Sequence, residues 1–107
     1  MKLLFVCSRN QWRSRTAEDL FKNRSGIEVR SAGTEPSARI RVTAKLIDWA
    51  DLILVMEKRH WQRLSERFPN ETADKNFDIL DIPDEYGYMD PELVEMLEVA
   101  VGPYLIG

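Results

Sequence analysis

With 107 residues, of which 44% are hydrophobic and 31% charged, the chain is long enough for one globular domain with a single core, spanning residues 1–107. Its formal net charge of −3 gives no overall attraction to nucleic acid, and no apolar run approaches the roughly 20 residues of a membrane span. One cysteine excludes an internal disulfide framework, and no secretory signal follows Met1. We therefore expect a cytoplasmic protein without a membrane partner, and nucleic acid is disfavoured as a partner.

Predicted strands and helices alternate along the chain. Continuously apolar runs at 3–6 and 52–56 predict two strands buried on both faces of a parallel sheet. Asp90-Pro91-Glu92 is a strong helix start, because a capping residue precedes a proline at the first helical position. The other expected elements are strands at 27–30 and 77–80 and helices at 14–23, 42–49 and 58–68, the last one ended by Pro69. This alternation predicts an α/β domain with a parallel sheet.

The loop after the first strand combines a nucleophile with an anion site. Cys7, the only cysteine, lies where the strand ends and a loop leads into a helix, and Arg13 lies at the far end of that loop. Backbone N–H groups and the positive end of a helix dipole at such a junction favour anions, and they favour a thiolate over a thiol. The guanidinium fork of an arginine suits phosphate oxygens. Taken singly, Cys7 could be a small buried hydrophobe and Arg13 a solvated helix residue.

Residues that can carry chemistry follow several of the predicted strands. Cys7 follows the first strand, Glu57 the strand at 52–56, and Asp84 the strand at 77–80. Ligands of parallel sheets bind beyond the carboxyl ends of the strands, at the point where the strand order reverses. We therefore expect these residues to gather at one edge of the sheet.

The spacing of Cys7 and Arg13, followed by Ser14, resembles the signature of the low-molecular-weight protein tyrosine phosphatases. Further segments similar to that family follow in family order, namely 14–18 (SRTAE), 31–34 (SAGT), 51–56 (DLILVM) and 83–87 (PDEYG). The resemblance implies a three-layer αβα sandwich with a four-stranded parallel sheet and the phosphatase loop after the first strand.

The resemblance also implies an activity, which is phosphomonoester hydrolysis, in the first place of protein phosphotyrosine, through a phosphocysteine intermediate on Cys7. Ser14 would hydrogen-bond the Cys7 sulfur, or it could be a plain helix cap, and Asn10 would supply left-handed backbone geometry. No cofactor or metal is implied, and phosphate-like oxyanions would inhibit. The implied phosphate-binding residues are Ser8, Arg9, Asn10, Gln11, Trp12, Arg13 and Ser14.

Three aspartates compete for the role of general acid, which protonates the leaving group and later deprotonates water. Asp84, in a loop beside Pro83, matches the family's acid best. Asp81 directly follows a predicted strand and could be structural, and Asp90 is best explained as a helix cap.

The walls of the substrate cleft are less well defined by the sequence. Trp12, Tyr86 and Tyr88 could face an aromatic leaving group, although aromatic residues are more often part of a core. His60, the only histidine, could formally pair with Cys7, but its charged neighbours favour a solvated helix face. The segment between Thr34 and Asp51, which usually helps to wall the cleft, is shorter than in a typical family member.

Other functions stay open at this point. Arg9 and Glu85 stand where the family usually has glycine and proline, which suggests a phosphate-binding module without turnover. A phosphorylated small molecule or RNA end is another possible substrate, since the loop arginines suit any phosphate. Arsenate reductases that relay electrons through further cysteines are excluded, because the chain has no second cysteine. A single-cysteine reductase that uses an outside thiol stays open as an alternative.

Overall fold

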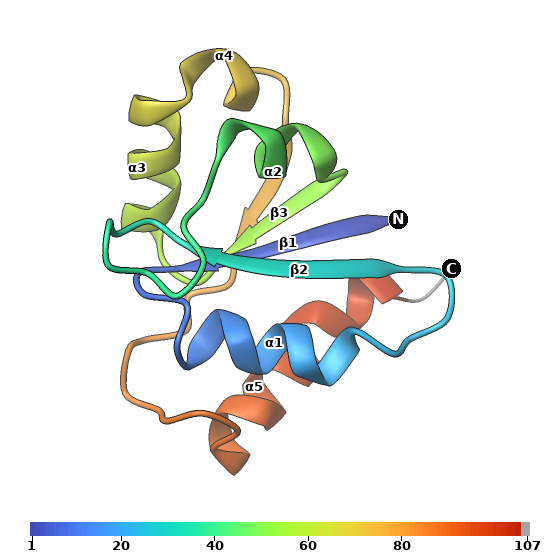
Figure 1. Ribbon diagram of the computed structural model, residues 1–107. Helices are drawn as coiled ribbons and strands as arrows, with labels where there is room; N and C mark the ends of the chain where they lie inside the picture. Colours follow the sequence, from blue (N-terminus) through green and yellow to red (C-terminus); the bar gives the residue numbers. More distant parts are fainter. Residues whose placement is uncertain (106–107) are drawn as a thin grey trace.

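The computed structural model describes residues 1–105 and is built around a four-stranded parallel sheet (Figure 1). The strands are β1 (Lys2–Cys7), β2 (Glu28–Gly33), β3 (Leu52–Val55) and β4 (Asn76–Ile79), in the order β2-β1-β3-β4. β1 pairs with β2 on one side and with β3 on the other. The chain therefore leaves β1 in one direction and later crosses to its other side, which places the reversal of strand order between β1 and β3.

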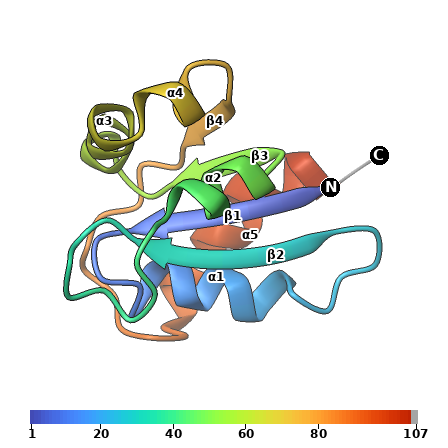
Figure 2. The same ribbon diagram turned by 45° about the horizontal axis from the view of Figure 1, so that its top comes forward.

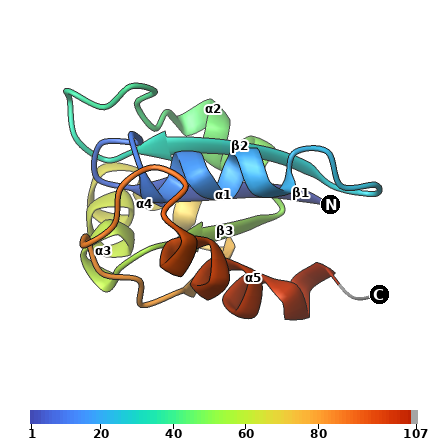
Figure 3. The same cartoon turned by 90° about the horizontal axis from the view of Figure 1, so that it is seen from below.

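Helices cover both faces of the sheet. α1 (Arg13–Phe21) and α5 (Pro91–Leu105) lie on one face, and α2 (Ala44–Trp49), α3 (Lys58–Arg67) and α4 (Pro69–Thr72) lie on the other (Figures 1 and 3). The predicted three-layer αβα sandwich with a four-stranded parallel sheet is confirmed. None of the helices within residues 1–105 has the length and apolar character needed to cross a membrane.

The sheet divides the core into two clusters, as the alternation of side chains along a strand requires. Leu3, Phe5 and Cys7 of β1 belong to the cluster with Ala17, Leu93 and Leu97 from α1 and α5. Leu4 and Val6 belong to the opposite cluster with Ile47 and Leu64. The latter two come from α2 and α3, which lie on the same face of the sheet (Figure 2). Because β1 is buried on both faces, its end at Cys7 is held firmly in place.

The predicted ranges agree with the observed elements to within a few residues, and two differences, the end of β2 and the additional helix α4, have clear physical reasons. β2 continues past Arg30, because it stays paired with β1 until Gly33 lies opposite Cys7. Pro69 follows α3 as expected, but it also begins α4, since its fixed φ and missing N–H group suit the first position of a helix.

Gly33 lets the loop after β1 pack closely against the end of β2. A Cβ atom at this position would lie 2.5 Å from the Ser8 carbonyl oxygen and 2.7 Å from the Ala38 Cβ atom. Backbone hydrogen bonds from Gly33 to Ile40 and from Val42 to Gly33 then fold the following segment back toward the same place. The shortened segment after Thr34 therefore still packs against the loop that carries the candidate site.

Candidate active site

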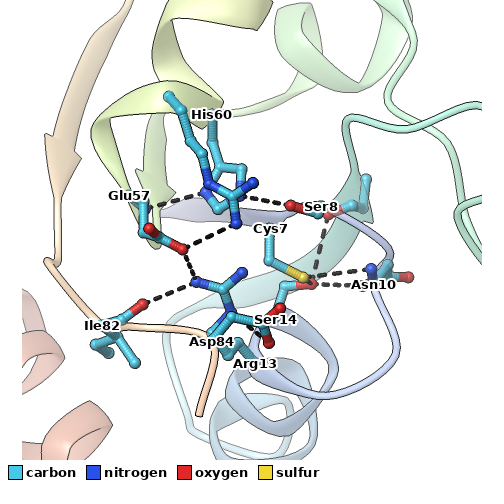
Figure 4. Close-up of polar contacts among 11 residues, drawn as sticks. Cys7, Ser8, Asn10, Arg13, Ser14, Glu57, His60, Ile82 and Asp84 are labelled. Carbon is cyan, nitrogen blue, oxygen red and sulfur yellow. Dashed lines mark hydrogen bonds and ion pairs between the residues drawn. The ribbon is translucent and has the colours of Figure 1, made fainter.

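A pocket of about 290 Å³ lies at the carboxyl end of β1. It contains most of the predicted site residues together with side chains from later parts of the chain. Its lining consists of Cys7, Ser8, Arg9, Gln11, Trp12, Arg13, Glu35, Arg59 and Asp84. The structure thus brings Cys7, Arg13 and Asp84 to one place (Figure 4). Asn10 and Ser14, also predicted to bind phosphate, are fully buried and do not line the pocket.

The backbone carbonyl groups of the loop after β1 are held by a later segment of the chain. The carbonyl oxygens of residues 7–10 accept hydrogen bonds from the segment at 34–39, which packs behind the loop. The donor–acceptor pairs are Thr34 N to Cys7 O (2.9 Å), Glu35 N to Ser8 O (3.0 Å), Arg39 N to Arg9 O (2.9 Å) and Arg39 Nε to Asn10 O (3.1 Å). In a trans peptide the N–H group points opposite to the C=O group, so the N–H groups of residues 8–11 point away from these donors. Loop amides that face away from their backbone partners are suited to bind an anion.

A chain of hydrogen bonds ends at the Cys7 sulfur. The Ser31 hydroxyl donates to the Glu18 carboxylate, so its oxygen accepts from Asn10 Nδ2 at 2.8 Å. Asn10 Nδ2 also donates to Ser14 Oγ at 2.7 Å (Figure 4). Ser14 Oγ lies 2.9 Å from Cys7 Sγ and 3.4 Å from the Ala32 carbonyl oxygen, and a Cys7 thiolate, which can only accept, would receive the Ser14 proton. Asn10 has the expected left-handed backbone, with φ 57°, and its own N–H group lies 3.3 Å from the sulfur. The chain therefore points two donors at Cys7.

Ser14 lies inside α1, where Trp12 is the N-cap residue, so the helix-cap alternative for Ser14 is wrong. Ser31 and Glu18 were not predicted as members of the site. Both lie within segments that resemble the phosphatase family, but only the pairing of β1 with β2 and the packing of α1 bring them to Asn10.

The Arg13 guanidinium is held from several sides. It is 2% exposed, and its Nη1 donates to Glu57 Oε1 at 2.5 Å and to the Ile82 carbonyl oxygen at 2.8 Å. Its Nε lies 3.7 Å from Asp84 Oδ1. Burial alone would raise the pKa of Glu57, but the hydrogen bonds from Arg13 and Arg59 outweigh burial and bring the pKa below its usual value. Glu57 is thus an anion that orients Arg13. The sequence predicted its place at the edge of the sheet but not this contact.

His60 lies in a different environment from the one predicted. It is 1% exposed and does not lie on a solvated face, because the first turn of α3 packs against the loop after β1. Its Nδ1 accepts the Glu57 N–H group at 3.0 Å, and its Nε2 lies 3.0 Å from Ser8 Oγ. Both ring nitrogens are thereby engaged away from the sulfur, so a Cys7–His60 catalytic pair is not formed. Burial, reinforced by the charges of Arg13 and Arg59, lowers the pKa of His60 to about 3.

The buried neutral His60 predicts a specific loss of stability in acid. Between the ordinary pKa of 6.5 and about 3, the unfolded chain takes up a proton at His60 that the folded chain does not. The free energy of unfolding should therefore fall as the pH drops from about 7.5 to about 5, and it should fall by about 2 kcal/mol less in the His60→Asn variant. Urea unfolding of both proteins at the two pH values measures this difference. Equal losses would contradict the assignment of a neutral His60.

The three candidate aspartates have different surroundings. Asp84 lines the pocket, and its side chain is 50% exposed. Asp81 is exposed outside the pocket, and Asp90 caps α5 by accepting the Glu92 N–H group at 2.9 Å. Of these three aspartates, Asp84 is therefore the one whose carboxylate lies at the pocket.

Of the aromatic residues predicted for the cleft, Trp12 lines the pocket and is 49% exposed. Tyr86 packs instead against the core between the sheet, α1 and α5. Tyr88 donates to Asp19, with Arg15 over its ring at 4.9 Å. Neither tyrosine lines the pocket, because the loop after Pro83 lies against α1 and the core.

Within residues 1–105, no group of three or more His, Cys, Asp or Glu side chains could hold a metal ion.

Comparisons with known proteins agree with this geometry. No family model matches the sequence. A protein-arginine-phosphatase from Geobacillus stearothermophilus is 34% identical over an alignment of 100 residues that covers 71% of this chain and 67% of the relative. A low-molecular-weight protein tyrosine phosphatase from T. tengcongensis has the same fold, with a TM-score of 0.73 at 24% identity over 95% of this chain and 93% of that one.

Another similar structure is that of a mutant of the arginine phosphatase YwlE with a phosphorylated active-site serine. The two chains are 26% identical with a TM-score of 0.69, and the match covers 97% of this chain and 96% of that one. The fold, with one cysteine at the end of β1 and the pocket beside it, places the chain in the class of cysteine-dependent phosphatases. This chain belongs to the low-molecular-weight protein tyrosine phosphatase family.

Proposed function

We propose that this protein removes phosphoryl groups from protein side chains through a phosphocysteine intermediate on Cys7. The observation that carries the proposal is one pocket that brings together the Cys7 sulfur, which accepts the Asn10 N–H group at 3.3 Å, the Arg13 guanidinium and the Asp84 carboxylate. These groups supply what phosphoryl transfer needs, namely a nucleophile, an oxyanion site and an acid. A free thiol nucleophile also suits a reducing compartment such as the cytoplasm.

In the first step the Cys7 thiolate attacks phosphorus, and the bond from phosphorus to the leaving oxygen breaks. Asp84 donates its proton to that oxygen. Arg13 and the loop amides hold the three equatorial oxygens as their charge shifts in the transition state.

In the second step water attacks phosphorus, and Asp84 accepts the proton of that water. The phosphorus–sulfur bond breaks, which releases inorganic phosphate and restores the thiolate. Ser14 stabilises the sulfur anion here, because its hydroxyl lies 2.9 Å from Cys7 Sγ and can donate to the thiolate.

Phosphotyrosine is the first candidate substrate, because half-exposed Trp12 lies at the pocket beside the nucleophile and offers a surface for an aromatic ring. Phosphoarginine is the second candidate. The protein-arginine-phosphatase relative favours it, and so do the carboxylates of Glu35 and Asp84, which line the pocket and could pair with a guanidinium group.

The test of the proposed function is hydrolysis of p-nitrophenyl phosphate with and without vanadate, followed by a comparison of substrates. Vanadate-sensitive turnover is expected, and its absence would favour a phosphate-binding module. Rates on matched phosphotyrosine and phosphoarginine peptides, a nucleotide and a phosphorylated RNA end would then assign the substrate. A phosphotyrosine rate at least tenfold above the others would support the first candidate, and a reversed order would overturn it.

Replacing Asp84 by asparagine should slow poor leaving groups most. Without the acid, an alkyl phosphate must expel an unprotonated alkoxide, whereas p-nitrophenolate leaves readily without a proton. We expect a loss of about 10²-fold for poor leaving groups and a much smaller one for p-nitrophenyl phosphate under conditions where the first step limits the rate. The slope of log kcat/KM against leaving-group pKa measures the difference.

The matched control is Asp81→Asn, a change of the same kind in the neighbouring exposed loop outside the pocket. Its slope should equal that of the unaltered protein. A uniform loss for all leaving groups in Asp84→Asn would argue against the acid role.

A further inference from the structure

Ser8 forms a side-chain hydrogen bond that has no role in the two proposed steps of phosphoryl transfer. Its hydroxyl oxygen lies 3.0 Å from Nε2 of the buried His60, while the residue lines the same pocket as Cys7 (Figure 4). The hydroxyl therefore lies between a buried imidazole and the space that an anion would occupy.

The direction of this hydrogen bond follows from the neighbouring contact. The Glu57 N–H group can only donate, so His60 Nδ1 must accept, and the single proton of the neutral ring is on Nε2. Nε2–H then donates to Ser8 Oγ. Because the lone pair of Ser8 is used in this way, its own hydroxyl proton points elsewhere.

Both partners are held in place. His60 is 1% exposed in the first turn of α3, where it forms a capping box with Glu57. The Ser8 carbonyl oxygen accepts from Glu35 N at 3.0 Å, which fixes the backbone of Ser8 from the other side. The hydroxyl thus has a defined position at the pocket wall, and only its proton is free to turn.

We propose that the Ser8 hydroxyl is an additional donor to the phosphoryl group in the pocket, and that His60 is the positioning residue that aims it. The inference rests on the proposed function, since the phosphoryl group is the anion that receives the bond. His60 acts only through Ser8 and does not touch the substrate.

The same short stretch of chain would then control both ends of the phosphate loop. The carboxylate of Glu57 holds Arg13 at the end of the loop, and the N–H group of Glu57 selects the tautomer of His60 that reaches Ser8 at its beginning. The start of α3 therefore positions residues at both ends of the anion-binding loop, in addition to capping α3 itself.

Binding of inorganic phosphate, measured by calorimetry, tests the inference without relying on turnover. Ser8→Ala and His60→Asn should each weaken phosphate binding about tenfold, the usual effect of losing a hydrogen bond to a charged group. The double variant should be no weaker than either single one, because His60 acts through Ser8. His60→Gln, whose amide can donate to Ser8, should recover most of the affinity, and so should Ser8→Thr.

The control is Ser65→Ala, which removes a hydroxyl from α3 that bonds only the Trp61 carbonyl oxygen, outside the pocket. It should bind phosphate as the unaltered protein does. Independent, multiplying losses in the double variant would overturn the role of His60, since a general loosening of the fold would produce them. If His60→Asn fails to fold, the comparison of Ser8→Ala with Ser8→Thr decides on the donor role of Ser8, because Ser8→Thr keeps the hydroxyl donor that Ser8→Ala removes.

Failure of this inference and failure of the proposed function give different results. A protein that binds phosphate and hydrolyses p-nitrophenyl phosphate, but binds phosphate equally well as Ser8→Ala, would overturn only the donor role of Ser8. A protein that neither binds phosphate nor turns over substrate would overturn both.

Discussion

Replacing Cys7 by serine is expected to abolish turnover while phosphate binding persists. A serine hydroxyl is a far weaker nucleophile than a thiolate, so the rate on p-nitrophenyl phosphate should fall by about 10⁴-fold or more. The anion site should survive, because it consists of the N–H groups of residues 8–11 and the Arg13 guanidinium, all of which are unchanged. Steady-state kinetics and phosphate calorimetry on the same preparation measure the two effects separately.

The two readouts also distinguish loss of chemistry from loss of fold. If Cys7→Ser loses both turnover and phosphate binding, the variant is misfolded or the loop depends on the sulfur for its shape. The N–H group of Asn10, 3.3 Å from the sulfur, gives a way to detect the second case, because its hydrogen exchange should then accelerate. Turnover at the unaltered rate would exclude Cys7 as the nucleophile.

Replacing Arg13 by lysine is expected to cost about 10³-fold or more in kcat, even though the charge is kept. A lysine has one compact ammonium group. It cannot bond Glu57, reach the Ile82 carbonyl oxygen and still present two parallel donors to phosphate oxygens, as the planar guanidinium can. The loss should be larger in kcat than in the affinity for phosphate, because the guanidinium follows the charge that develops in the transition state.

Arg24→Lys is the matched control for this prediction. Arg24 is exposed and outside the pocket, so the same chemical change there should leave kcat within a factor of about two. If Arg13→Lys loses only phosphate affinity and keeps kcat, Arg13 binds the ground state and transition state alike, and the proposed role in catalysis is wrong.

The elements that the sequence predicted well are those with strong local signals. The apolar runs at 3–6 and 52–56 became β1 and β3, because a strand buried on both faces leaves a continuous apolar pattern. Asp90 and Pro91 begin α5 as expected. The end of β2 was missed, because Ser31, Ala32 and Gly33 carry little strand propensity and are held in the sheet only by β1.

Residues of the candidate site were predicted where they are close in the sequence, and missed where long-range packing defines them. His60 looked solvated, because its neighbours Lys58 and Arg59 are charged, and a one-dimensional pattern does not show that the start of α3 meets the loop after β1. Glu57 was placed at the correct edge of the sheet, but its bond to Arg13 depends on the neighbouring positions of β1 and β3.

The sequence by itself determined the chemistry of the loop, because Cys7, the amides of residues 8–11 and Arg13 belong to one short strand–loop–helix segment whose geometry is local. The tertiary structure alone decided which distant groups complete it. It placed Asp84, which the resemblance already favoured among three aspartates, at the pocket, buried His60 against Ser8 and brought Glu57 to Arg13. The physical reason is that these contacts come from the carboxyl ends of different strands, and the order and register in which strands meet depend on the packing of the whole sheet.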